Sequence, residues 1–103
     1  MDPNAVRDLT SPDSVLLECV AAGEERALWE LSARHGASLY ALAYSILGDA
    51  ARAEEALRRT YEDARYDAAR FDPTHFPVLR WLSDVTREHA LELARATSAC
   101  GQS

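Results

Sequence analysis

Acidic and basic side chains crowd into one stretch of the sequence, residues 52–70, at spacings that could serve catalysis or binding. Paired carboxylates act as general acid and general base only where their surroundings hold the two pKa values apart. Here each carboxylate has an arginine three or four positions away, which predicts ion pairs on a helix surface. We therefore interpret the stretch as a charged helix face that is solvated or binds a partner.

Other arrangements that would indicate an enzyme are missing from the sequence. It contains no glycine-rich phosphate loop, no nucleophile elbow and no HExxH zinc motif. Cys19 and Cys100 lie far apart, with no CxxC pair and no cluster of cysteine and histidine. We interpret His35 as a bend residue, His75 as a loop residue and His89 as a hydrogen-bonded structural residue. The sequence thus predicts a protein that is not an enzyme and uses no metal or other cofactor.

The charge of the chain limits its nucleic-acid binding. Its 103 residues carry a net charge of -6, and all 11 basic residues are arginines. A protein that binds nucleic acid unaided usually neutralises phosphates with a basic surface. Any DNA binding by this chain is therefore expected to be local or assisted.

The sequence gives no sign of a membrane segment or of export. No apolar run approaches the roughly 20 residues that cross a bilayer. The segment 1–10 contains acidic residues where a signal peptide has a basic start. We expect a cytoplasmic protein without membrane contact.

The elements that position these groups are expected to be helices. Alanine, leucine, glutamate and arginine dominate, and long runs of valine, isoleucine and threonine are missing. Ser11-Pro12-Asp13 has the order of an N-cap and a first-turn proline, which predicts a short helix that Gly23 closes. A first long helix is expected from Glu24 to Gly48, with a bend at His35-Gly36.

Two further long helices are expected after Asp49, about 50–70 and 77–96, separated by a turn at 71–74. The pairs Glu54–Arg58, Glu55–Arg59 and Arg59–Asp63 have the i,i+4 spacing of helix-surface ion pairs. Apolar stripes are expected on the two helices: Ala53, Leu57, Thr60, Ala64, Ala68 and Phe71 on the first, and Val78, Leu82, Val85, His89 and Leu93 on the second.

The fold predicted from these elements is all-α. Residues 11–96 form a compact bundle of three long helices plus a short N-terminal helix. Residues 1–10 are expected to be a flexible N-terminus and residues 97–103 a flexible C-terminal tail. Helix periodicity alone assigns no function to such a bundle.

Five short motifs are informative through their order. They are GEERALWEL at 23–31, HGASLYALAYSILG at 35–48, RAEEALRRTY at 52–61, ARFDP at 69–73 and RWL at 80–82. In this order and spacing they resemble region two of extracytoplasmic-function sigma factors, over about residues 13–95. The resemblance implies a helical domain that binds core RNA polymerase and the minus-ten element of a promoter during transcription initiation.

The resemblance also implies roles for single residues. The second long helix would bind the clamp helices of core RNA polymerase through Glu54, Glu55, Arg58, Arg59 and Glu62. The following loop and the last helix would contact promoter DNA through Asp72, His75, Phe76, Arg80, Arg87, Glu88 and Arg95. Tyr61 and Trp81 are expected to pack in the core, although the family's tryptophan lies beside the site of strand opening.

The sequence departs from the family on both faces. Arg58-Arg59 stand where the family has a Gln-Glu pair. On the last helix, Arg87-Glu88 and Arg95-Ala96 stand where the family has Arg-Asn and Arg-Arg. The arginines after residue 74 are balanced by Asp84, Glu88 and Glu92, so the expected basic surface is neutralised and DNA affinity in isolation should be poor.

Two alternatives to a sigma-factor domain therefore stay open. The first is a degenerate sigma-like regulator that binds an anti-sigma factor or another protein without recognising a promoter by itself. The second is an unrelated helical adaptor, which the charged face would support equally well. The helix-turn-helix domain that accompanies region two in the family is not among these 103 residues, as expected for either a fragment or a stand-alone protein.

Overall fold

Four helices make up most of the residues that the computed structural model describes, 12–71 and 77–101, with side chains to residue 96. They are α2 (Asp13–Ala21), α3 (Glu25–Leu47), α4 (Ala50–Asp67) and α5 (Val78–Gly101). No strand occurs within these ranges, so the predicted all-α bundle of one short and three long helices is confirmed. The N-terminal segment 1–10, predicted to be flexible, lies outside the described residues.

Local sequence signals set the ends of three helices. Gly23 and Gly48 have positive φ values of 92° and 64°, a backbone conformation that residues other than glycine rarely adopt. They follow α2 and α3 as predicted. Asp49 caps α4, because its carboxylate accepts a hydrogen bond from the Ala51 amide at 3.2 Å. The Arg52 guanidinium donates to the same carboxylate at 3.0 Å and lowers the pKa of Asp49.

Two helix boundaries differ from the prediction. α2 begins at Asp13 with Pro12 at its N-cap, one residue later than expected, and the Pro12 carbonyl accepts from the Val15 amide at 3.0 Å. α5 continues to Gly101 rather than ending near Ala96. The residues from 97 to 100 include neither glycine nor proline, so nothing in the chain stops the helix there.

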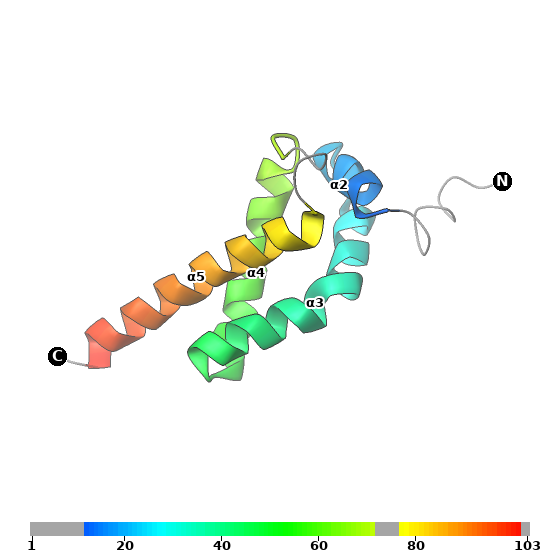
Figure 1. Cartoon of the computed structure of the whole chain (residues 1–103). Helices are drawn as coiled ribbons and strands as arrows, with labels where there is room; N and C mark the ends of the chain where they lie inside the picture. The colour runs from blue at the N-terminus through cyan, green and yellow to red at the C-terminus, as the bar shows by residue number, and fades with distance from the viewer. Residues whose placement is uncertain (1–11, 72–76, 102–103) are drawn as a thin grey trace.

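The long helix α3 changes direction about half-way along its length while remaining one continuous helix (Figure 1). His35-Gly36 lies in the middle of it, where the bend was predicted. The same point is tied to the start of α2, because Asp13 lies 2.7 Å from His35 Nε2 and accepts from Arg34 Nη1 at 3.1 Å. His35 therefore joins two helices and is not an isolated bend residue.

The buried side chains form two clusters. The larger, which we call the leucine cluster, contains leucines of α2, α3 and α5, including Leu16, Leu31 and Leu82, each at most 1% exposed. Smaller residues such as Ala64 of α4 complete it. The smaller contains only alanines, namely Ala43, Ala53, Ala56 and Ala90. α5 crosses α4 (Figure 1), and the two helices are joined by the buried hydroxyls of Thr60 and Thr86, 3.0 Å apart.

Candidate protein and nucleic-acid interface

The helix α4 has two faces of opposite character. Its buried face consists of small residues, Ala53, Ala56, Thr60 and Ala64, each no more than 1% exposed. At 3.6 residues per turn, the charged residues fall on the other side of the helix. The five residues predicted to bind polymerase are all on this outer side, exposed or half-buried: Glu54, Glu55, Arg58, Arg59 and Glu62. We call these five residues the α4 charged face.

Glu55 is the centre of an ion-pair network on the α4 charged face. Arg58 donates to both of its carboxylate oxygens, from Nε at 3.0 Å and from Nη2 at 2.8 Å, and Arg59 Nε donates at 2.8 Å. Arg58 also donates to Glu62 at 3.1 Å. These bonds, that of Arg58 first, lower the pKa of Glu55 to about 2, and Glu55 in turn raises the pKa of Arg58. Glu55 is therefore ionised at neutral pH and cannot serve as a general acid.

One of the three predicted ion pairs is confirmed. Glu55 and Arg59 are joined, whereas the pairs Glu54–Arg58 and Arg59–Asp63 are wrong. Arg58 contacts Glu55 at i−3 and Glu62 at i+4 instead, and Glu54 makes no ion pair with another described residue. An exposed carboxylate without a partner remains free to pair with a cation of another protein.

Asp63 forms a contact between helices rather than within α4. Its carboxylate lies 2.6 Å from Nε2 of His89 on α5, and Nδ1 of the same ring lies 3.0 Å from Glu92. The His89 side chain is 18% exposed, in agreement with its predicted role as a hydrogen-bonded structural residue. The contact joins α4 to α5, and the Asp63 carboxylate is therefore not part of the α4 charged face.

The described part of the predicted DNA-contacting set lies on one exposed face of α5. Arg80, Arg87, Glu88 and Arg95 are exposed and share this face by helical periodicity. Asp84 lies on the same side and accepts from Arg87 Nη1 at 3.3 Å. Acidic and basic groups are thus interleaved, and the face carries little net positive charge to attract phosphates. The predicted loop residues Asp72, His75 and Phe76 lie outside the described residues.

Tyr61 and Trp81, which were predicted to pack in the core, both lie against the leucine cluster. Trp81 is half-buried against the leucine cluster and stacks on Phe71 with ring centroids 4.6 Å apart. Tyr61 packs on the same cluster. By contrast, Trp29 is 76% exposed and Tyr66 is 74% exposed. The helix phase could have identified Trp29, because it falls outside the stripe that contains Leu28 and Leu31.

The network around Glu55 predicts a pH effect on stability. A carboxylate whose pKa is depressed in the folded state contributes stability above its unfolded pKa, and loses it as the pH falls through the folded value. We expect Glu55→Gln to lower the free energy of unfolding at neutral pH by an amount that shrinks from pH about 4.5 to about 2. Urea denaturation of both proteins across this range measures the difference.

Glu54→Gln is the matched control for this experiment. Glu54 is the sequence neighbour of Glu55 and makes no ion pair within the described part of the chain. Its substitution should change the unfolding free energy by the same small amount at every pH in the range. A Glu55→Gln difference that stayed constant with pH would show that the Arg58 and Arg59 contacts do not depend on ionised Glu55.

No cluster of three or more metal-binding side chains occurs among residues whose side chains are described. None of α2 to α5 combines the length and the apolar character of a membrane-crossing helix. Comparison of the chain with protein-family models, with curated proteins and with solved structures found no match. The assignment of a function therefore depends on the motif order and on the surfaces of α4 and α5.

Proposed function

We propose that this chain is a sigma-factor region-two domain of the extracytoplasmic-function type, which binds core RNA polymerase and a promoter's minus-ten element. The observation that carries the proposal is the arrangement of α4. Its inward face is buried through small residues, and its outward face bears all five residues for which the family resemblance implies polymerase binding. The five motifs support the proposed family, and the α4 charged face is the proposed docking surface.

The chemistry of this face suits a polar docking surface. Glu55 holds two guanidinium groups in place, so part of the side-chain entropy of Arg58 and Arg59 is already lost before a partner arrives. Glu54 and Glu62 add exposed carboxylates on the same side. Such a surface recognises a partner of matching charge pattern and gains specificity more than affinity.

Binding to purified core RNA polymerase tests the proposal. Labelled protein titrated with core enzyme at low salt should form a saturable complex. Reversal of two exposed charges, Glu54→Arg with Arg58→Glu, should weaken that complex by at least about tenfold. The matched control, Arg87→Glu on α5, should leave polymerase affinity unchanged because it lies on another helix face. The absence of any complex with the unaltered protein would overturn the proposal.

A degenerate sigma-like regulator is the second candidate, and the α5 face favours it. Along α5 the three arginines are matched by Asp84, Glu88 and Glu92, and two of these acids already contact basic groups of the same helix. In this function the chain binds an anti-sigma factor or another protein and does not recognise a promoter by itself. A complex with core polymerase that gives no promoter-dependent transcription, even on a pre-opened template, would favour this candidate.

A further inference from the structure

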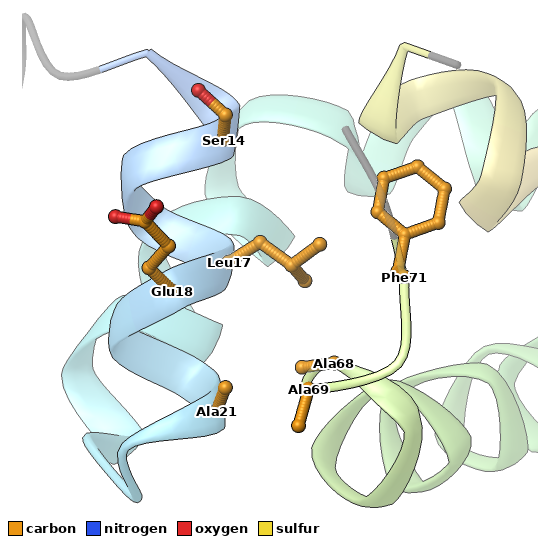
Figure 2. A pocket seen from close by; sticks show the side chains of 7 residues that line it. All are labelled: Ser14, Leu17, Glu18, Ala21, Ala68, Ala69 and Phe71. Carbon is orange, nitrogen blue, oxygen red and sulfur yellow. The ribbon is translucent and has the colours of Figure 1, made fainter. Parts of the chain in front are cut away.

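An apolar groove lies between α2 and the end of α4, away from the α4 charged face. It has a volume of about 320 Å³, and Leu17 points across it from α2 toward the side lined by Phe71, Ala68 and Ala69 (Figure 2). Glu18 lies at the α2 rim and is exposed. Glu18 makes no ion pair with a described residue, so the groove offers an apolar floor beside a carboxylate without a partner.

Trp29 and Arg26 of α3, which we call the knob, have features that complement this groove. Trp29 is 76% exposed, so most of this large aromatic residue is in contact with water. Arg26 lies three residues earlier, on the same side of the helix, and is also exposed. Arg26 forms no ion pair within the described ranges. A large apolar side chain and a guanidinium therefore project together from one turn of α3.

The other exposed aromatic side chains lack this combination. Tyr44 is 46% exposed, but no basic residue lies three or four positions from it. Tyr66 has Arg70 four positions ahead, and that arginine already lies 3.9 Å from Asp67. Trp29 does not fill the groove of its own chain, because it is 76% exposed and is not among the residues that line the groove. The groove of a second copy is a site of matching chemistry.

We propose that this chain associates with itself through insertion of Trp29 of one copy into the α2–α4 groove of another, with Arg26 beside Glu18. The indole ring packs against the half-buried Phe71 and over the buried Leu17, and the guanidinium pairs with the carboxylate at the rim. The contact joins two different surfaces, so each copy can give one Trp29 and receive one. The proposal is independent of the proposed function, because neither surface includes the α4 charged face.

Sedimentation equilibrium of the whole chain tests the proposal. The average mass should rise above that of the 11.4 kDa monomer as the concentration approaches about 1 mM, the range of a small interface. About 0.15 M salt is needed, since the net charge of -6 opposes association at low ionic strength. Trp29→Ala, which removes the knob, and Ala69→Arg, which fills the groove from an exposed position, should each weaken association at least about tenfold.

A mixture of the two variants gives the sharpest result. Trp29→Ala keeps an intact groove and Ala69→Arg keeps an intact knob, so equal amounts should form a one-to-one dimer although neither variant associates alone. Exchange of the rim charges adds a second test. Arg26→Glu and Glu18→Arg should each weaken association about threefold, and the double variant should restore it.

Three outcomes would overturn the proposal. They are an unaltered protein that stays monomeric at about 1 mM, a variant mixture that stays monomeric, and association that survives Ala69→Arg. The last would indicate a symmetric contact between two α3 helices. Unchanged circular dichroism and melting temperature of each variant show that a loss of association is not a loss of folding.

Discussion

Replacement of Leu82 by alanine is expected to lower the free energy of unfolding by about 3 kcal/mol and the melting temperature by roughly 15 °C. Leu82 is 1% exposed and belongs to the leucine cluster that α5 shares with α2 and α3. Truncation removes buried apolar surface and leaves a cavity that three helices cannot close by a small shift. Since a domain of this size has a total stability of roughly 5–15 kcal/mol, the loss is a large fraction.

Leu91→Ala is the control for this measurement. It removes the same atoms from the same helix at a position that is 41% exposed, and it should cost well under 1 kcal/mol. Urea denaturation with a single fitted slope gives both values. If the two substitutions cost the same, α5 does not pack against the leucine cluster along this side.

Helix positions could be predicted because their signals are local. Gly48-Asp49 ends one helix and caps the next within two residues, and Asp49 caps α4 as its type and place suggest. The end of α5 has no such signal. Alanine and threonine in the last turns neither favour a stop nor exclude one, so periodicity placed the end of the helix near Ala96, soon after Leu93, the last residue of the apolar stripe.

The contacts between helices could not be predicted in the same way. Asp13 reaches His35 across 22 positions, and Asp63 reaches His89 across 26. Each pairing depends on how two helices cross, which the spacing within one helix does not fix. Spacing within α4 alone led to the expectation that Asp63 pairs with Arg59, four residues away. A partner on another helix competed for its carboxylate and is the one it contacts.

Which side chains of α4 face outward could be predicted, because helical periodicity alone determines it. The outward position of Glu54, Arg58 and Glu62 follows from the charged residues of α4 avoiding one side of the helix. Which partner Arg58 chooses does not follow, because i−3 and i+4 partners are equally in reach. The exposure of Trp29 was within reach of the sequence, since a tryptophan out of phase with a leucine stripe has no place in the core.

Hydrophobic periodicity did not predict which residues of α4 and α5 are buried most deeply. The expected stripes contained Leu57 and Val85, whereas the structure buries Ala56 and Ala90 completely and leaves Leu57 only half-buried. An alanine at a helix crossing lets two backbones approach closely, and a larger side chain is then displaced to the flank of the contact. The size of an apolar side chain therefore did not predict its burial where α4 crosses α3 and α5.

The alanine cluster predicts that added volume is harmful there. Ala43 of α3, Ala53 and Ala56 of α4 and Ala90 of α5 are each 0% exposed and belong to one cluster. A leucine at position 90 adds three carbon atoms where three helices meet. Either the helices separate or the new side chain adopts a strained rotamer, and both cost free energy.

We expect Ala90→Leu to lower the free energy of unfolding by about 2–3 kcal/mol, although leucine is a good helix former and more apolar than alanine. The matched control is Ala96→Leu, an identical change at an exposed position of the same helix, which should alter stability by less than about 0.5 kcal/mol. Thermal and urea unfolding of the two variants measure the difference. A neutral or stabilising Ala90→Leu would contradict the close approach of α3, α4 and α5 at the four buried alanines.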